Sequence, residues 1–269
     1  MFGITKAALV SSVIGFCGLV FSVGALAEIP AGSKIPICND SGEWPPYFYW
    51  ERQNGSQTDN LLGYDIDVLN EIMANNGFEY SFELIAWSRC LLEVERGNDY
   101  AMLTSAAYSD ERNEKYLISE DYYTVQPHYF YHQANFPDGL DIQNLEEFKN
   151  YKVCGLRGYN YTNFGVDVGT IDTGTRHFPQ LIEKTRRKRC DLFLGRYEIF
   201  AGFAKTGNDY IRKHNLGTAP MPGVAGDKFY MMVSRNYPYS DDLVALLNSA
   251  INELKNSGRD QKLLAPYLN

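Results

Sequence analysis

The feature that most constrains the fold is a strand–helix–strand order that occurs twice along the chain. In the first half, strands are predicted over 35–38, 78–84 and 100–103, with helices over 65–76 and 88–96. In the second half, strands over 152–156 and 191–194 alternate with helices over 178–189 and 196–205. This order is typical of parallel strands joined by crossover helices. Two such units predict an α/β protein with two lobes, for which 269 residues are long enough.

The spacing of apolar residues supports these elements. Ile66, Leu69 and Met73 recur at helical spacing ahead of a stop signal at 76–77. Residues 78–84 then alternate between apolar and polar side chains, which is the pattern of a half-buried strand. A helix followed by a strand is therefore expected here.

Two further signals predict a hairpin and a C-terminal helix. Asn54-Gly55 is a sequence that favours a two-residue hairpin turn. Apolar residues at helical spacing over 241–254 predict an amphipathic helix, with Ser240 as its N-cap and Ser257-Gly258 as its stop.

The strand order also predicts where a ligand binds. In open α/β sheets the binding crevice lies beyond the carboxyl ends of the strands. The candidates are therefore the residues that directly follow Cys38, Leu84, Leu103, Leu156 and Leu194.

The N-terminus has the pattern of a secretory signal peptide over 1–27. Lys6 precedes the apolar run Ala7–Leu26, and Ala25-Leu26-Ala27 offers the small residues of a cleavage site. A membrane anchor is the alternative, because the run is nearly long enough to span a bilayer. No basic cluster follows the run, and Cys17 lacks the small preceding residue of a lipidated cysteine. We therefore expect soluble export to the periplasm.

Charge and cysteine content narrow the partners and the compartment. A formal net charge of −8 argues against nucleic acid, because that kind of binding depends on Lys and Arg. No two of the remaining cysteines have the C-x-x-C spacing of a zinc or redox site; these cysteines are Cys38, Cys90, Cys154 and Cys190. Two disulfides are expected in an oxidising compartment, and four cysteines allow three pairings.

Motifs of common enzymes and metal sites do not occur in the sequence. The chain has no nucleophile elbow, H-E-x-x-H, P-loop or EF-hand loop. His128 and His132 share a face of an expected strand, but two histidines without a third ligand make a weak zinc site. We expect no metal and no cofactor. Asp65 and Asp67 do not face each other on a helix, and Asp65 is explained by its place near the helix N-terminus.

Aromatic residues and one arginine are the strongest site candidates. Trp44 and Trp87 both follow strand ends, where aromatic walls suit a small-molecule cleft, although core packing is the alternative. Arg112 follows the strand that ends near 104–105, and its guanidinium is suited to hold a carboxylate. A salt bridge from Arg112 to Glu111 or Glu114 is the competing interpretation.

A set of motifs resembles the bacterial extracellular solute-binding proteins that serve polar amino acid ABC transporters. The resemblance covers essentially all of the chain after residue 27, in order. It rests on Leu62-Gly63-Tyr64-Asp65-Ile66-Asp67-Val68-Leu69, the Trp87 region ending at Gly97-Asn98-Asp99, Ser109-Asp110-Glu111-Arg112, Ile118-Ser119-Glu120-Asp121-Tyr122-Tyr123, Asp227-Lys228 through Gly258, and Pro266-Tyr267-Leu268.

The resemblance implies a two-lobed periplasmic binding protein fold of type II. This is an α/β fold of two mostly parallel sheets with flanking helices, joined by a hinge with two crossings near 126–131 and 224–231. Lobe one would be residues 28–127 and 229–269, and lobe two would be residues 128–228. The resemblance also implies a monomer that has a membrane permease as its partner.

The resemblance also assigns roles to individual residues. Arg112 would hold the α-carboxylate of the ligand, and Ser105 would donate a nearby hydrogen bond. Trp44 and Trp87 match the positions of an aromatic sandwich. Asn160 matches a hydroxyl position of lobe two that contacts the carboxylate.

Two positions depart from the family pattern. Ala107 stands where a second serine is usual, and Arg196 stands where amino-acid binders carry an aspartate for the α-ammonium group. The hypothesis that follows is a ligand without a free cationic amine, namely a small carboxylate, a diacid or an amino-acid derivative. The alternative is that Arg196 points away from the cleft.

The two-lobed arrangement implied by the resemblance also indicates the disulfide pairing. A bridge between lobes would prevent hinge motion, so we expect Cys38 with Cys90 in lobe one and Cys154 with Cys190 in lobe two.

The function implied is a periplasmic receptor, not an enzyme, that captures a small carboxylate-bearing solute for an ABC-type permease. One alternative is a sensory or orphan receptor that signals to a membrane kinase or cyclase. Another is a dehydratase-type enzyme on this scaffold, with Glu120 or Asp121 as a base.

Overall fold

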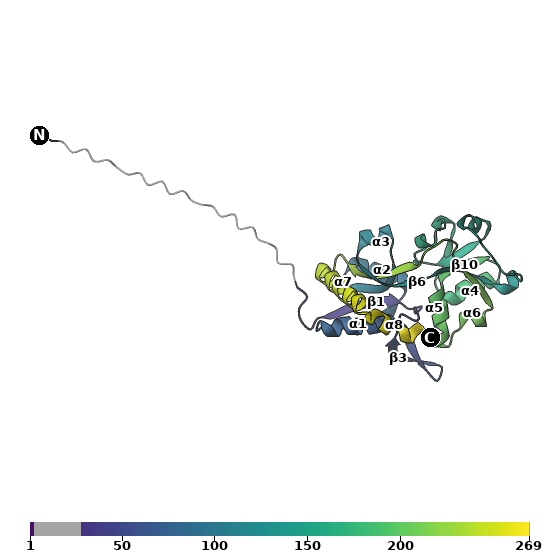
Figure 1. Cartoon of the computed structure of the whole chain (residues 1–269), viewed down its shortest axis with the longest axis horizontal. Helices are drawn as coiled ribbons and strands as arrows, with labels where there is room; N and C mark the ends of the chain where they lie inside the picture. The colour runs from purple at the N-terminus through teal and green to yellow at the C-terminus, as the bar shows by residue number, and fades with distance from the viewer. Residues whose placement is uncertain (3–27, 269) are drawn as a thin grey trace.

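The computed structural model describes residues 1–2 and 28–268, and Figure 1 shows two bodies of strands and helices side by side. The expected signal peptide over 1–27 lies, apart from its first two residues, outside the described residues. None of the described helices is long and apolar enough to cross a membrane.

The first sheet has five strands in the order β4-β1-β5-β12-β6. Its strands are β1 (Lys34–Asp40), β4 (Glu79–Ile85), β5 (Met102–Ala107), β6 (Tyr116–Val125) and β12 (Asp227–Ser234). β1 pairs in parallel with β4 and β5, whereas β12 pairs antiparallel with β5 and β6. Because β12 comes from the C-terminal part of the chain, the chain returns to this sheet after building the second one.

The second sheet has five strands in the order β11-β7-β10-β8-β9. Its strands are β7 (Pro127–His132), β8 (Val153–Leu156), β9 (Asp172–Thr175), β10 (Leu192–Arg196) and β11 (Leu216–Pro220). β8 pairs in parallel with β9 and β10, and β7 pairs antiparallel with β10 and β11. The α/β fold class is confirmed, but both sheets are mixed, not mostly parallel, because the strands next to the crossings run against their neighbours.

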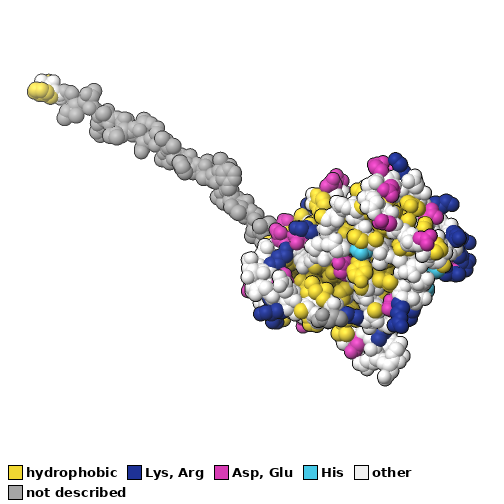
Figure 2. Space-filling model, turned by 45° about the vertical axis from the view of Figure 1, so that its right-hand side comes forward, with side chains coloured by type: hydrophobic (Ala, Val, Ile, Leu, Met, Phe, Trp, Pro, Cys, Tyr) yellow, Lys and Arg dark blue, Asp and Glu magenta, His cyan; other side chains and the backbone are white. Residues whose placement is uncertain are grey.

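Helices pack on both sheets, and we call each sheet with its helices a lobe. Lobe one carries α1 (Tyr64–Asn75), α2 (Trp87–Arg96), α3 (Asp110–Lys115), α7 (Ser240–Ser257), α8 (Arg259–Leu268) and the hairpin of β2 (Tyr49–Gln53) and β3 (Ser56–Leu62). Lobe two carries α4 (Phe178–Arg186), α5 (Tyr197–Gly202), α6 (Tyr210–Lys213) and short 3-10 helices η1 (Gln133–Asn135), η2 (Leu145–Asn150), η3 (Thr162–Phe164), η4 (Val168–Thr170) and η5 (Phe203–Thr206). On the face in Figure 2, acidic and basic side chains are interspersed around a central group of hydrophobic ones.

Helix α1 shows why this sequence folds locally as it does. Its apolar residues bury one face, and Gly63 precedes it with a φ of 130°. A Cβ on Gly63 would lie 2.2 Å from the backbone oxygen of Tyr47, so only glycine fits at this crossing of two backbone segments. The turn between β2 and β3 is formed by Asn54 and Gly55, both with positive φ, as the sequence predicts.

Several predicted boundaries are wrong by a few residues. Strand β5 continues through Ala107, and β10 continues through Gly195 to Arg196. In both cases a neighbouring strand supplies backbone partners, since Ala107 pairs with Phe229 of β12 and Arg196 pairs with Pro127 of β7. Two more boundaries differ, because Ser240 is the first residue of α7 instead of its N-cap and the predicted helix over 178–189 ends at 186.

Each lobe contains one disulfide. Cys38 is bonded to Cys90, and Cys154 is bonded to Cys190. This is the pairing expected when each bridge stays within one lobe, and it leaves the two lobes without a covalent cross-link between these sulfurs.

We predict that removing the bridge of lobe two lowers the free energy of unfolding by about 3–4 kcal/mol. The bridge joins residues 36 positions apart, and cross-linking a segment of that length restricts the unfolded chain by this amount. Urea unfolding of the Cys154→Ala/Cys190→Ala variant measures the loss. The Cys38→Ala/Cys90→Ala variant is the matched control, and a similar loss is expected because its separation is 52. A loss below about 1 kcal/mol in both variants would contradict this account.

Candidate functional site

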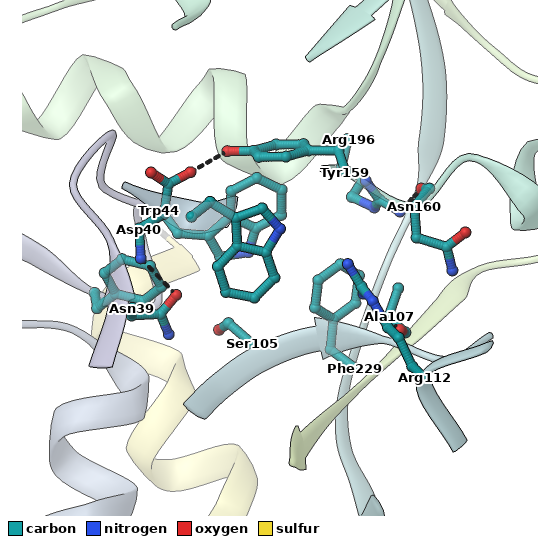
Figure 3. Close-up of a pocket in the computed structure, with 12 residues that line it drawn as sticks. Asn39, Asp40, Trp44, Ser105, Ala107, Arg112, Tyr159, Asn160, Arg196 and Phe229 are labelled. Atoms are coloured by element: carbon teal, nitrogen blue, oxygen red, sulfur yellow. Dashed lines mark hydrogen bonds between the residues drawn. The ribbon is translucent and has the colours of Figure 1, made fainter. Parts of the chain in front are cut away.

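A small cavity lies where the two lobes meet. Its volume is about 30 Å³, and it is lined by Asn39, Asp40, Trp44, Phe48, Trp87, Ser105, Ala107, Arg112, Tyr159, Asn160, Arg196 and Phe229 (Figure 3). The residues predicted to contact ligand, Trp44, Trp87, Ser105, Arg112, Asn160 and Arg196, are all among them. The structure thus brings all six together, and their role as ligand contacts stays a prediction.

Strand ends position most of the lining. Asn39 and Asp40 end β1, Ser105 lies near the end of β5, and Arg196 ends β10. Tyr159 follows the end of β8 by three residues. The rule that ligands bind beyond the carboxyl ends of parallel strands therefore locates this cavity correctly.

Arg112 is buried and has no carboxylate partner among the described residues. Its Nη1 donates to the backbone oxygen of Ala107 at 2.8 Å, and its Nη2 donates to that of Gly158 at 3.2 Å. The predicted alternative of a salt bridge to Glu111 is not formed, because Glu111 pairs with Lys115. Burial, with the nearby charge of Arg196, lowers the pKa of Arg112 to about 10, so the group stays charged at neutral pH.

Arg196 lines the cavity, but its charge is already paired. Its Nη2 and Nε donate to the Oδ2 of Asp227 at 2.6 and 3.0 Å, and its Nη2 also donates to the backbone oxygen of Asn160. The rings of Phe164 and Phe229 lie 5.0 and 5.1 Å from its guanidinium carbon. The alternative that Arg196 points away from the cleft is therefore wrong, and the charge of Arg196 is balanced by Asp227.

The two tryptophans form walls of the cavity and are fixed by their indole nitrogens. Trp44 donates to the hydroxyl of Tyr123 at 3.1 Å. Trp87 donates to the backbone oxygen of Gly158 at 2.9 Å, which links lobe one to lobe two. The guanidinium carbon of Arg112 lies 5.6 Å from the centre of the Trp87 ring, so the aromatic face supports the cation.

Ser105 is held by a buried carboxylate below the cavity. Its hydroxyl donates to the Oδ2 of Asp65 at 2.8 Å and accepts from the hydroxyl of Tyr123 at 2.7 Å. In this structure the proton of Ser105 is donated to Asp65, so the expected donation to a ligand stays a prediction that requires the hydroxyl to change its partner. Ser105 also has a φ of 55°, a strained value for a residue other than glycine.

Asp65 is more than a residue near a helix N-terminus. It is fully buried and accepts hydrogen bonds from the hydroxyls of Thr104, Ser105 and Tyr122. Burial raises its pKa to about 7, although these three hydrogen bonds act in the opposite direction. The sequence interpretation missed this role because the partners of Asp65 lie 39 to 57 positions away.

The side chain of Asn160 joins the lobes. Its Nδ2 donates to the backbone oxygen of Tyr108 at 2.5 Å, and its Oδ1 accepts from the hydroxyl and the amide of Thr162. Both ends of the Asn160 amide are therefore engaged in hydrogen bonds within the protein. The predicted contact between Asn160 and a ligand carboxylate would require these hydrogen bonds to rearrange.

The lining also contains residues that were not among the predicted ligand contacts, among them Asn39, Asp40, Phe48 and Tyr159. Asp40 accepts from the hydroxyl of Tyr159 at 2.8 Å and from the backbone amide of Gly42. Burial raises the pKa of Asp40 despite these bonds. Phe229 and the paired Asp227 were missed as well, and no local signal marks them because β12 is distant in sequence from its neighbours.

Other sequence candidates lie outside this cavity. Asp121, one possible base, accepts from Lys228 and Lys255, and neither it nor Glu120 belongs to the lining. His128 is bonded to the hydroxyl of Thr218. Within the described part of the chain, no group of three or more His, Cys, Asp or Glu side chains is placed to hold a metal ion.

We predict that the contribution of Asp65 to protein stability falls as pH rises from about 4 to about 7. The folded protein keeps a proton on this group up to a pKa of about 7, whereas the unfolded chain releases it near the ordinary value of 3.8. The folded state therefore binds more protons across this window, and each rise in pH costs it stability. Urea unfolding at several pH values between 4.5 and 7.5 gives the free energy of unfolding at each pH. This free energy should decrease less steeply with pH for Asp65→Asn than for the natural protein. Asp40 contributes equally to both proteins, so identical slopes would count against this assignment.

We further predict that Asp227→Asn lowers the free energy of unfolding by about 3 kcal/mol, because it leaves the buried charge of Arg196 without its partner. Asp121→Asn is the matched control, since Asp121 pairs with two partly exposed lysines and should cost about 1 kcal/mol or less. Urea unfolding measures the free energy of unfolding of both variants. Equal losses would contradict the claim that burial makes the Arg196–Asp227 pair more important than the exposed pairs of Asp121.

Comparison with known proteins gives a consistent picture. Residues 37–269 match the bacterial extracellular solute-binding proteins, family 3. The probable amino-acid-binding protein YxeM of Bacillus subtilis (strain 168) is 23% identical over 235 residues, which cover 85% of this chain and 82% of that protein. The L-cystine-binding protein TcyA of the same organism is 20% identical over 222 residues, which cover 82% and 76%.

A solved structure shares the fold. The arginine-, lysine-, histidine-binding protein ArtJ from the thermophilic bacterium Geobacillus stearothermophilus superimposes with a TM-score of 0.68 at 17% identity, covering 87% of this chain and 95% of that one. Because the family match extends over most of the sequence and the fold agrees with it, this chain belongs to the bacterial extracellular solute-binding proteins, family 3.

Proposed function

We propose that this protein captures a small carboxylate-bearing solute between its lobes and presents it to the permease of an ABC transporter. The observation that carries the proposal is the state of Arg112. A guanidinium has five N–H donors, and described residues accept from only two of them, both through backbone oxygens. A buried cation without a carboxylate partner, beside a cavity, is suited to an anionic ligand.

A carboxylate fits this group better than other small ligands do. Its two oxygens match the planar fork of a guanidinium, and the resulting pair is strong where water is excluded. The walls formed by Trp44, Trp87 and Phe229 supply apolar contact for the rest of the ligand. The similarity to the probable amino-acid-binding protein YxeM, to the L-cystine-binding protein TcyA and to the arginine-, lysine-, histidine-binding protein ArtJ supports a small carboxylate-bearing ligand for this chain too.

Capture would take place by closure of a hinge. The resemblance puts lobe one at residues 28–127 and 229–269 and lobe two at 128–228, with crossings near 126–131 and 224–231. Because β7 begins at Pro127 and β12 begins at Asp227, we move Pro127 to lobe two and residues 227–228 to lobe one. Contacts from Arg112 and Trp87 of lobe one to Gly158 of lobe two support closure at this point. A ligand that contacts both lobes stabilises the closed state by its differential affinity for it.

The same proposal includes export and assembly. The expected signal peptide over 1–27 would direct the chain to the periplasm, where its two disulfides form readily. There it would act as a monomer that meets the permease in the membrane.

We predict that the thermal unfolding temperature of residues 28–269 rises with a small carboxylate and that Arg112→Ala abolishes the rise. A panel of short monocarboxylates, dicarboxylates and amino acids is the probe. At 100 times the dissociation constant a ligand adds about 2.7 kcal/mol to stability, which a melting curve resolves.

Two variants sharpen this experiment. Arg112→Lys keeps the charge but not the fork, and we expect it to bind at least tenfold more weakly. Arg89→Ala is the matched control, because the side chain of Arg89 is 69% exposed on α2 and does not line the cavity. A shift that survives in Arg112→Ala, or a panel that shifts nothing, would overturn the proposal.

A further inference from the structure

We infer that Asp65 is a positioning residue of the ligand site, although it does not line the cavity. Its carboxylate fixes the direction of two series of hydrogen bonds that begin at the cavity wall, so that Ser105 presents a lone pair, not a proton, to the cavity. The inference rests on the proposed function, since it takes this cavity as the ligand site, but its test needs no ligand.

The first series leads from an aromatic wall of the cavity to Asp65. Trp44 donates from its indole nitrogen to the hydroxyl of Tyr123 at 3.1 Å, and Tyr123 donates to the hydroxyl of Ser105 at 2.7 Å. Ser105 in turn donates to the Oδ2 of Asp65 at 2.8 Å. Three consecutive hydrogen bonds therefore connect Trp44 to a fully buried carboxylate.

The second series leads to the same carboxylate from the end of β1. The backbone amide of Asp40 donates to the Oδ1 of Asn39 at 2.8 Å (Figure 3), so the Nδ2 of Asn39 faces Thr104. This Nδ2 donates to the hydroxyl of Thr104 at 2.8 Å, and that hydroxyl donates to the Oδ2 of Asp65 at 2.5 Å. Because Asn39 and Asp40 line the cavity, Asp65 is connected to two parts of the lining.

The groups at the two ends decide the direction of both series. An indole N–H and an amide NH₂ can only donate, whereas an ionised carboxylate can only accept. Each hydroxyl between them therefore accepts from the cavity side and directs its own proton toward Asp65. Bonds that point the same way strengthen one another. The proton of Ser105 is thus used by Asp65, and the cavity meets a lone pair of the Ser105 oxygen.

A neutral group at position 65 would change this order. A protonated carboxyl, or the amide of asparagine, has to donate one hydrogen bond itself. Its neighbours at hydrogen-bond distance are the hydroxyls of Thr104, Ser105 and Tyr122, so one of these must become an acceptor and release its proton. Of the three, Ser105 is the one that lines the cavity, where the released proton can be donated to water or to a ligand. The charge of Asp65 therefore reaches Trp44 through Ser105.

The titratable groups packed around Asp65 keep their protons near neutral pH. They are tyrosines, and burial raises the pKa of each above the ordinary value of 10: Tyr47, Tyr64, Tyr122 and Tyr123. Two carboxylates act on these tyrosines from neighbouring elements, namely Glu198 of α5 on Tyr47 and Asp260 of α8 on Tyr64. A change of charge at Asp65 itself is therefore the event to follow between pH 5 and pH 9.

The experiment uses protein labelled with 5-fluorotryptophan, whose fluorine NMR signals report the surroundings of each indole. The sequence has three tryptophans, and the signal lost in Trp44→Phe is that of Trp44. We expect this signal to shift between pH 5 and pH 9 with its midpoint near the pKa of Asp65, which is about 7. Trp50 in β2 belongs to neither series, so its signal is the internal reference and should shift at least threefold less.

A matched pair of variants separates positioning from a merely structural role. Ser105→Ala and Thr104→Val each remove one hydroxyl that donates to Asp65, but only Ser105 belongs to the series of Trp44. We expect Ser105→Ala and Asp65→Asn to reduce the pH-dependent shift of Trp44 at least threefold, and Thr104→Val to keep at least half of it. Melting curves show which variants fold, and the two hydroxyl variants keep the test decisive if Asp65→Asn does not.

Asp40 needs a control of its own. Burial raises the pKa of this carboxyl as well, and Tyr159, which donates to it, also contacts the ring of Trp44. We expect Asp40→Asn to keep at least half of the pH-dependent shift of Trp44. Loss of the shift in this variant would assign the shift to Asp40 and overturn the role of Asp65.

The other outcomes distinguish this inference from the proposed function. A Trp44 signal that does not shift with pH, or that shifts equally in the natural protein and in Asp65→Asn or Ser105→Ala, would overturn the role of Asp65 and leave carboxylate capture by Arg112 intact. Equal loss of the shift in Ser105→Ala and Thr104→Val would also overturn it. A panel of carboxylates that leaves the unfolding temperature unchanged would instead overturn the proposed function, while the pH response of Trp44 would stand.

Discussion

The burial of charge between two lobes is the constraint on which this site depends. Asp40, Arg112, Arg196 and Asp227 are all buried near one junction, and burying an unpaired charge costs several kcal/mol. Each group must therefore find a partner, and most partners lie in the other lobe or on another strand. Arg196 has Asp227, Asp40 has the hydroxyl of Tyr159, and Arg112 has only peptide oxygens. Arg112 and Asp40 therefore have no partner of opposite charge among the described residues, and a ligand site can be built around them.

Local patterns were enough to predict the framework. The apolar spacing of α1, the Asn-Gly turn between β2 and β3, and the alternation of β4 are set by neighbours in sequence. The position of Trp44, Trp87 and Arg112 after strand ends was also sufficient to place them at one cavity, because parallel strands share an edge. Resemblance to a family added Ser105, Asn160 and Arg196, which the residues alone did not indicate.

The remaining features depend on contacts that no window of sequence contains. The end of β5 was predicted too early because Thr104 and Ser105 are polar, yet Asp65 and β12 satisfy them from a distance. Asp227 is 31 positions from Arg196, and Tyr159 is 119 positions from Asp40. Such pairs form only when the lobes come together, so the sequence offered candidates for the site but not their partners.

A single peptide oxygen gives the junction a further property. The backbone oxygen of Gly158 accepts from both Arg112 and Trp87, which uses both of its lone pairs on donors of lobe one. Gly158 has a φ of 79°, and a Cβ there would lie 3.2 Å from the Trp87 ring, so the close approach depends on glycine. The positions of Arg112 and Trp87 therefore depend on the same backbone atom of lobe two, so a shift of the backbone at Gly158 would affect the cation and the aromatic wall together.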